Sequence, residues 1–315
     1  SSNSLESLKQ QFLSCLLDAQ FVISENDDDK KITSELSGRN VLICDGISTL
    51  HFNPLNLLNE VKKYTNNVVY TVHISKNKGQ KLLLINDDFS LSSEGKLSKE
   101  YLDGYEFSGI SYQHAYRKKN NNDSSLYLPM GKNKTLQSFG HSRPALFLDR
   151  DGIINEDHGY VSKFEDIVWN EESIELIKFA NQRKYLVFVL TNQSGISQGF
   201  YSEDDVKSLH HSMNNYLISK QAIICSWYYG PYSYKNAIKG YKYKSLTRKP
   251  GAGMMLQALS EFNIDLNNSI MVGDKLSDQL ILSGPKYFHL KGKYNLDGAS
   301  GKVISSLLEI KESML

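Results

Sequence analysis

Short apolar runs alternate with amphipathic segments from residue 143 to the C-terminus. The runs are rich in β-branched and aromatic residues, as expected for strands that are buried on both faces of a sheet. The regular alternation with helical segments predicts an α/β fold of the Rossmann-like kind, with a parallel sheet between layers of helices. The expected strands are ALFLD (145–149), LVFVLTN (186–192), AIICSWYY (222–229), SIMVGD (269–274) and YFHL (287–290), and the expected helices are 171–182, 202–219, 252–262 and a C-terminal helix.

A polar segment separates this half from the rest of the chain. Residues 117–142 are rich in Asn, Ser, Lys and Gly around one short apolar patch, LYLPM, which is typical of a linker. We therefore expect a smaller α/β domain over residues 1–116, a linker over 117–142 and a second domain over 143–315. In the smaller domain LICDGISTLHF predicts a strand and a turn, LNLLNEVKKY a helix, and VVYTVHI, KLLLIND and FSGISYQ strands.

Composition narrows the classes of partner. Lys+Arg number 36 and Asp+Glu 35, so no broad basic surface for nucleic acid is expected. Cys15, Cys44 and Cys225 are far apart and indicate a reducing, cytoplasmic compartment. No apolar run approaches the roughly 20 residues that cross a bilayer, so no membrane partner is expected. The opening residues, SSNSLESLKQ, are not a signal peptide, and we expect that the true start of the protein is missing.

Two aspartates separated by one residue end the first strand of the second half. Asp149 and Asp151 in sequence FLDRDG would repel each other unless a hard cation such as Mg²⁺ lies between them. Asp149 can then attack phosphorus, while Asp151 protonates the leaving oxygen and later activates water. Gly152 permits a sharp turn after the strand. The alternative is a solvated aspartate pair in an ordinary turn.

Three further polar motifs follow the later strands or precede a helix. LTNQSG (190–195) offers a hydroxyl and an amide to a phosphate, and RKPGAGM (248–254) offers two cations. MVGDKLSD (271–278) offers a third carboxylate, Asp274. Each motif alone is compatible with plain turn chemistry. Because ligands of such sheets sit at the carboxyl ends of the strands, we expect the four motifs to form one site.

These motifs, over residues 143–291, resemble the haloacid dehalogenase (HAD) phosphatase superfamily. FLDRDGIINEDHGYV, TNQSGIS, RKP and MVGDKLSD look like its heptose bisphosphate phosphatase branch, which is related to histidinol-phosphate phosphatases. The resemblance implies a HAD sheet without a large cap, with Asp149 as nucleophile and Asp151 as acid/base. It also implies Mg²⁺ held by Asp149, by the backbone carbonyl of Asp151 and by Asp274.

The same resemblance assigns the phosphate and substrate contacts. Thr191, Asn192 and Lys249 would bind the transferring phosphoryl group, and Arg248 would contact the substrate. His158 would help to position the substrate, although a lone loop histidine is otherwise often just exposed. Two further roles are implied: Asp278 would orient the loop around Asp274, and Ile153, where the superfamily often has Thr, would be a packing position.

The chain departs from the resembled branch in one loop. That branch usually carries a zinc site with a Cys-Pro-His start and a Cys-x-Cys end, whereas this chain has Gly230-Pro231-Tyr232 and Ser245-Leu246-Thr247. We expect no structural zinc. Residues 228–249, hereafter the tyrosine loop, contain six tyrosines and six lysines or arginines. Two compatible hypotheses remain open: the tyrosines pack in place of zinc, or the loop grips an anionic substrate.

The first domain faintly resembles the later part of a sugar-phosphate nucleotidyltransferase. Asp45 and Gly109 would then help to hold metal and sugar. A Gly-rich nucleotide-binding opening is absent, so we expect no transferase activity from this domain.

The motifs together predict a Mg²⁺-dependent phosphatase that acts on a phosphorylated sugar of the heptose bisphosphate kind. The alternatives are a phosphatase for another phosphomonoester (a phosphoprotein or a nucleic-acid end), a fragment of a bifunctional transferase–phosphatase, and a non-catalytic phosphate-binding scaffold. The oligomeric state stays open.

Overall fold

The computed structural model describes residues 41–44, 68–75, 82–86, 89–95, 98, 100–113, 125–129 and 142–315. The chain forms two compact units. Leu97–Asp103, Ser142–Ala258 and Ile264–Leu315 make up the second unit, and the remaining residues belong to the first.

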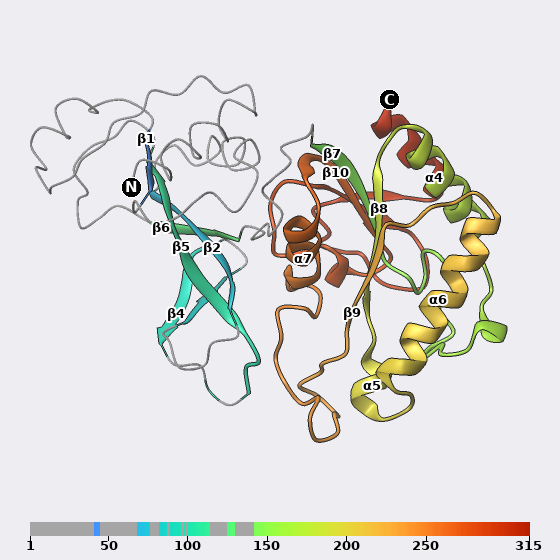
Figure 1. Cartoon of the computed structure of the whole chain (residues 1–315), viewed down its shortest axis with the longest axis horizontal. Coiled ribbons are helices and arrows are strands. Elements are labelled where there is room, and N and C mark those ends of the chain that lie inside the picture. Colours follow the sequence, from blue (N-terminus) through green and yellow to red (C-terminus); the bar gives the residue numbers. More distant parts are fainter. Residues whose placement is uncertain are drawn as a thin grey trace, which may run out of the picture. The chain divides into compact units, whose positions relative to one another are not determined.

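The second unit is built on a six-stranded sheet in the order β12-β11-β10-β7-β8-β9 (Figure 1). Every pair of neighbouring strands is parallel, as the alternating pattern predicted. The strands are β7 (Arg143–Leu148), β8 (Leu186–Asn192), β9 (Ser226–Gly230), β10 (Ile264–Gly273), β11 (Lys286–Leu290) and β12 (Lys302–Ile304).

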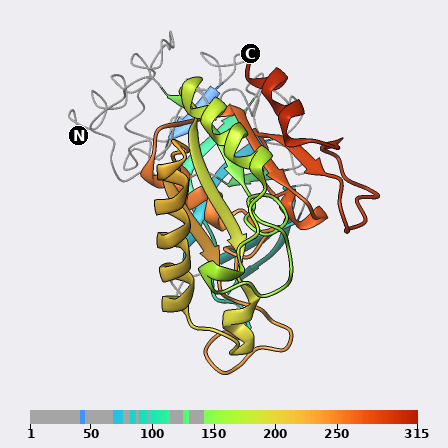
Figure 2. The ribbon, with the colours of Figure 1, turned by 90° about the vertical axis from the view of Figure 1, so that its right-hand side faces the viewer.

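Helices cover both faces of this sheet, with α4 and α6 on one side and α7 on the other (Figures 1 and 2). The helical elements are α4 (Glu171–Gln182), α5 (Ser194–Gln198), α6 (Glu203–Ser219), α7 (Gly253–Glu261) and the 3₁₀ helices η1 (Phe164–Asp166), η2 (Leu276–Asp278) and η3 (Leu307–Met314). The start of α6 is fixed by a capping box between Ser202 and Asp205. Among the described residues, none of the helices has both the length and the apolar character to cross a membrane.

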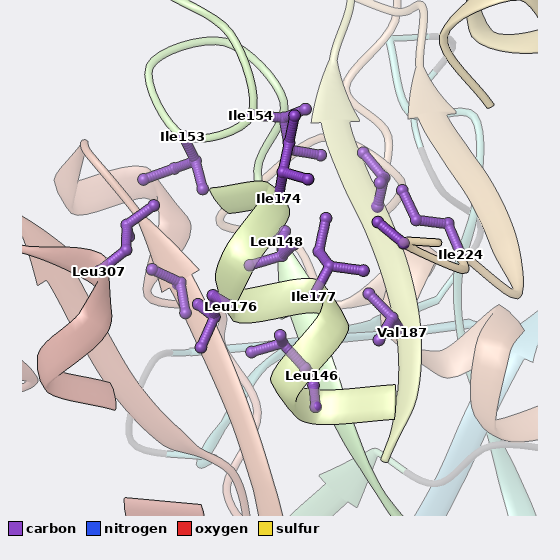
Figure 3. Close-up of a cluster of buried hydrophobic side chains, with 14 of the residues drawn as sticks. Leu146, Leu148, Ile153, Ile154, Ile174, Leu176, Ile177, Val187, Ile224 and Leu307 are labelled. Carbon is purple, nitrogen blue, oxygen red and sulfur yellow. The ribbon is translucent and has the colours of Figure 1, made fainter. Parts of the chain in front are cut away.

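The core lies between α4 and the sheet. Leu146 and Leu148 of β7 and Leu176 and Ile177 of α4 are fully buried in one cluster (Figure 3). Ile153 belongs to the same cluster, which agrees with its expected role as a packing position. Residues 149–152 therefore lie between two segments, the end of β7 and Ile153, that are both anchored in the core.

The predicted elements of this unit are present, with differences in extent and type. β10 begins at Ile264, before the expected start at residue 269. The strand expected over 222–229 begins only at Ser226, because Ala222 and Ile224 enter the core from the connection before it. The C-terminal helix is a 3₁₀ helix, η3. The short elements α5 and β12 were not predicted, since five or fewer residues give too little periodicity.

The first unit contains a second sheet, in the order β4-β3-β5-β2-β6, with β1 paired to β5. Its strands are β1 (Val41–Cys44), β2 (Val68–Ser75), β3 (Leu82–Ile85), β4 (Leu91–Gly95), β5 (Gly104–Gln113) and β6 (Ser125–Pro129). β6 lies within the segment expected to be a linker, because its apolar residues pair in parallel with β2. Asp45 and the expected helix LNLLNEVKKY lie outside the described residues, and Gly109 lies in β5, so the transferase resemblance stays a prediction.

Candidate active site

Polar residues from three neighbouring strands meet at one edge of the sheet in the second unit. Asp149 directly follows β7, Thr191 and Asn192 end β8, and Asp274 directly follows β10. β7 lies between β10 and β8, and its last residue, Leu148, pairs with both neighbours. The parallel topology therefore brings these motifs together at the carboxyl ends of the strands, as predicted.

Three buried carboxylates form the centre of this edge. Asp149, Asp274 and Asp278 each offer an oxygen, and these oxygens all lie within 4.8 Å of one another. The residues are only 4%, 5% and 1% exposed, respectively. The sequence had pointed to the side chains of Asp149 and Asp274 at this place, and the structure adds that of Asp278.

Lys249 supplies positive charge at this centre. Its Nζ lies 2.9 Å from Asp149 Oδ1 and 2.6 Å from Asp278 Oδ1. Burial lowers the pKa of Lys249, but the two carboxylates outweigh burial and raise that pKa overall. The lysine is therefore held as a cation against the predicted nucleophile.

Lys249 does not neutralise the whole cluster. Burial, reinforced by the charges of Asp278 and Asp151 and opposed by Lys249, raises the pKa of Asp149 to about 7. Burial also raises the pKa of Asp274 to about 6. The Oδ1 atom of Asp274 is buried and accepts no hydrogen bond, and Lys275 Nζ is 3.7 Å from it. Such a donor set fits a hard divalent cation such as Mg²⁺, which prefers carboxylate oxygens and would offset this excess negative charge.

Two glycines permit the close approach of these carboxylates. A Cβ on Gly152, whose φ is +92°, would lie 2.1 Å from Asp274 Oδ2. A Cβ on Gly273 would lie 2.2 Å from the side chain of Asp278. Gly152 therefore serves the expected turn and also leaves room for the carboxylate that faces it.

Asp278 fastens the loop that carries Asp274. Its Oδ2 accepts hydrogen bonds from the backbone N–H groups of Asp274 (3.1 Å) and Lys275 (2.9 Å). With Oδ1 paired to Lys249, both oxygens of Asp278 have partners within the protein. These contacts match the orienting role that the resemblance implied, and they leave Asp149 and Asp274 as the carboxylates better placed for a cation.

Asp151 faces a different set of partners. Arg150, which is fully buried, donates to it from Nε and Nη2 at 2.8 to 3.0 Å. Asn155 Nδ2 (3.1 Å) and Gln193 Nε2 (3.2 Å) donate to its two oxygens. Arg150 is held in turn by the carbonyl of Val161. The side chain of Asp151 thus lies in a hydrogen-bond network beside the carboxylate cluster and is 18% exposed.

Gln193 links that network to β8. Its Nε2 also donates to Thr191 Oγ1 (2.8 Å), and its Oε1 accepts from the hydroxyl of Tyr201 (2.8 Å). A Cβ on Gly195 would collide with the Tyr201 ring at 2.3 Å, so the turn after β8 needs a glycine to admit the ring. The sequence analysis missed Arg150, Gln193 and Tyr201 as parts of the site. Arg150 and Gln193 lie within two of the motifs, and this position in the sequence could have pointed to them.

The predicted substrate residues differ in where they lie. Asn192 bonds the backbone of Lys249 from both sides, accepting from its N–H (2.9 Å) and donating to its carbonyl (3.2 Å). Arg248 donates from Nη1 to Ser194 Oγ at 2.8 Å, which places it beside the turn after β8. His158 is 53% exposed and faces Glu156 at 3.2 Å. Arg248 is therefore grouped with the β8 motif, whereas His158 is not among the contacts of the carboxylate cluster.

The loop that carries His158 is anchored next to the cluster through Asp157. The Asp157 Oδ2 accepts from Lys275 Nζ (3.1 Å) and from the Tyr294 hydroxyl (2.7 Å). Burial would raise the pKa of Asp157, but these partners outweigh burial and hold the pKa well below its usual range. This tie was not visible in the sequence because Tyr294 comes after the recognised motifs.

Several tyrosines of the tyrosine loop make ring contacts and hydroxyl hydrogen bonds. Tyr229 and Tyr241 donate to the two oxygens of Glu203 at 2.8 and 2.9 Å. The ring of Tyr232 lies 6.0 Å from that of Tyr241 and 6.1 Å from that of Tyr243. These contacts favour the packing hypothesis for the tyrosines. The lysines at 235, 239 and 242 are exposed.

A parallel sheet that ends in a buried aspartate paired with a lysine defines the HAD class of phosphatases, the class that the sequence resembles. Comparisons with known proteins agree. Residues 148–292 match the family model described as polynucleotide kinase 3 phosphatase. The D-glycero-alpha-D-manno-heptose-1,7-bisphosphate 7-phosphatase of Burkholderia mallei is 45% identical over 134 residues, which cover 42% of this chain and 71% of the relative.

A second relative and a solved structure extend the comparison. The D-glycero-beta-D-manno-heptose-1,7-bisphosphate 7-phosphatase of Pasteurella multocida is 41% identical over 46% of this chain and 78% of its own length. The crystal structure of D,D-heptose 1,7-bisphosphate phosphatase from B. bronchiseptica, complexed with magnesium and phosphate, aligns with a TM-score of 0.47 and 21% identity over 54% of this chain and 97% of that one. The chain belongs to the family of heptose-1,7-bisphosphate phosphatases, which confirms the HAD fold class and the enzyme class expected from the motifs.

Proposed function

We propose that the chain is a Mg²⁺-dependent phosphatase that hydrolyses a phosphorylated sugar of the heptose bisphosphate class through Asp149. One observation carries this proposal: Asp149 is buried at the sheet edge, paired with Lys249 at 2.9 Å and clustered with two further carboxylates. A carboxylate in such surroundings can react with a phosphoryl group, because nearby positive charge offsets the negative charge of the reacting groups.

The reaction uses two aspartates in turn. An oxygen of Asp149 bonds to phosphorus while the bond from phosphorus to the sugar oxygen breaks, and Asp151 gives its proton to that oxygen. Asp151 then takes a proton from water, the water oxygen bonds to phosphorus, and the bond to Asp149 breaks to release inorganic phosphate. Lys249 offsets the negative charge that builds up on the phosphoryl oxygens.

Asp149, Asp274 and the backbone carbonyl of Asp151 would hold the Mg²⁺ cofactor. When bound, the ion would supply positive charge against the phosphoryl oxygens and the clustered carboxylates. Asp278 supports this site by fixing the backbone at Asp274 and Lys275. Arg150 and Gln193 hold Asp151 beside it.

The substrate class follows from the relatives together with the site. The relatives are named as 7-phosphatases of heptose 1,7-bisphosphates, in both anomeric forms. Arg248, Lys249, Thr191, Asn192 and His158 are the proposed contacts of such a substrate. Arg248 and Lys249 are the best supported, because they lie with the β8 turn and the carboxylate cluster. Asn192 acts at least in part by fixing the backbone of Lys249.

A substrate panel tests the proposal. The panel comprises the α and β heptose 1,7-bisphosphates, p-nitrophenyl phosphate and an oligonucleotide with a 3′-phosphate, each with Mg²⁺ and with EDTA. The oligonucleotide is included because the matching family model describes a polynucleotide 3 phosphatase. We expect Mg²⁺-dependent release of phosphate, highest kcat/KM on a heptose bisphosphate, and no turnover by Asp149→Asn. Preference for the oligonucleotide would move the substrate class, and no turnover of any phosphomonoester would leave a phosphate-binding scaffold.

A further inference from the structure

A short segment from the first half of the chain lies against the tyrosine loop. The N–H of Leu102 donates to the carbonyl of Lys244 (2.9 Å), and the N–H of Lys244 donates to the carbonyl of Glu100 (2.7 Å). Tyr101 and Lys244 thereby form a parallel bridge. Residues Leu97–Asp103 belong to the same compact unit as the active site, although they come before residue 142 in the sequence.

Among residues 100–103, which the structure describes, Asp103 is the one that is buried. It is 1% exposed, and its Oδ1 accepts from the N–H of Leu246 at 2.8 Å. Its Oδ2 accepts from Ser245 Oγ at 3.1 Å. A buried carboxylate is costly unless its hydrogen bonds are made, and bonds to an ionised acceptor are stronger than neutral ones. These two bonds therefore hold the backbone N–H of Leu246 and the side chain of Ser245.

That backbone is the base of the turn that presents Arg248 and Lys249. The N–H of Arg248 donates to the carbonyl of Ser245 (3.1 Å), and the N–H of Gly253 donates to the carbonyl of Leu246 (2.7 Å). Packing here is tight, since a Cβ on Gly251 would lie 2.5 Å from Leu246 O. A shift of Leu246 cannot be absorbed locally and would be passed on to the two cations that follow.

The side-chain contacts of Lys244 with this segment are partly exposed. Lys244 Nζ lies 3.1 Å from Glu100 Oε1 and above the rings of Tyr101 and Tyr234 at 4.8 and 5.0 Å. Exposed ion pairs contribute little to stability because solvent screens them. The buried bonds of Asp103 are thus the part of the segment that can control the turn.

We propose that Glu100–Asp103 is a positioning element of the active site, in which Asp103 holds the turn at residues 245–246 so that Arg248 and Lys249 meet the phosphoryl group. Phosphatase activity then depends on a piece of the first half of the chain. The inference rests on the proposed function only in taking Arg248 and Lys249 as phosphate contacts. The hold of Asp103 on Ser245 and Leu246, hereafter the clamp, rests on the hydrogen bonds of Asp103 alone.

Kinetics of the whole chain test the positioning role. Asp103→Ala should raise both the KM for p-nitrophenyl phosphate and the inhibition constant of inorganic phosphate about tenfold, with a smaller loss of kcat. Asp103→Asn, which keeps the shape and one acceptor, should restore part of this loss. Asp297→Ala, at an exposed aspartate of the same unit, is the matched control and should behave as wild type.

A second measurement does not need turnover. Lys235, Lys239 and Lys242 are exposed on the tyrosine loop, so trypsin should cut the loop faster in Asp103→Ala than in wild type or Asp297→Ala. If wild type hydrolyses no phosphomonoester, the proposed function fails while this digestion still tests the clamp. Unchanged kinetic constants in Asp103→Ala would overturn the positioning role, and unchanged digestion would overturn the clamp.

Discussion

Asp149 and Asp151 are two residues apart, yet the structure gives them opposite surroundings. On the Asp149 side, which comprises Asp149, Lys249, Asp274 and Asp278, buried charges face one another. On the Asp151 side, which comprises Arg150, Asp151, Gln193 and Tyr201, a chain of directed hydrogen bonds holds the carboxylate. The difference fits the two roles that we propose for this motif: a nucleophile whose charge must be neutralised, and an acid/base whose position must be kept.

Removal of the nucleophile should have the largest effect. Asp149→Asn should lower kcat by about 10⁴-fold or more, because the amide cannot bond to phosphorus as the carboxylate does. The raised pKa of Asp149 shows that its charged form is disfavoured by burial, so the variant should keep the fold. Steady-state kinetics and thermal unfolding measure both effects. Turnover within tenfold of wild type would remove Asp149 from the mechanism.

Removal of the lysine tests the charge balance on the Asp149 side. Lys249→Met should lower the free energy of unfolding by about 3 kcal/mol, because it leaves Asp149 and Asp278 buried without their cation. Thermal unfolding should show that Mg²⁺ stabilises this variant more than it stabilises wild type, since the cation would replace lost positive charge. Lys286→Met, at an exposed lysine, is the control. An equal response of both variants to Mg²⁺ would contradict the charge argument.

The two sides also differ in how far the sequence could predict them. Asp149 and Asp274 could be placed together because parallel topology sends strand ends to one edge, and that rule needs only strand assignments. Lys249 precedes a helix instead, so its place at the site came from the resemblance of its motif. The partners of Asp151 could not, because Gln193 bonds it through a side-chain direction that a turn sets. Arg150 could not be predicted either. An arginine between two aspartates is expected to be solvated, whereas Arg150 is fully buried. Asp103 was hidden by distance in the chain, because no local pattern reports a contact across 143 positions.

The pH dependence of stability tests the Asp151 side through His210, whose Nε2 lies 3.3 Å from Arg150 Nη1. Burial, together with the charge of Arg150, lowers the pKa of His210 to about 3, and His210 also stacks on Trp227. Its ordinary pKa is about 6.5, so between these values the unfolded chain binds a proton that the folded chain does not. Stability should therefore fall as pH falls from about 6.5 to about 3, by about 2 kcal/mol at pH 5.

Two variants isolate this contribution. His210→Phe keeps an aromatic ring against Trp227 and removes the titrating group, so its stability should decline less steeply between pH 7 and pH 5 than that of wild type. His211→Gln, at the exposed neighbouring position, should decline as wild type does. Denaturant unfolding at each pH gives the slopes, and parallel slopes for all three proteins would show that His210 is not a buried neutral group.

Removal of the Gln193 amide, which bonds several members of the Asp151 side, should have the smallest effect of these changes. Gln193 donates to Asp151 and Thr191 and accepts from Tyr201, so Gln193→Ala should displace the acid without removing it. We expect kcat to fall about tenfold with little change in KM, as is usual when a supporting hydrogen bond is lost. Gln198→Ala, which removes a bond to Tyr160 but none to Asp151, is the matched control. Equal kcat values for the two variants would mean that Arg150 and Asn155 keep Asp151 in place without the help of Gln193.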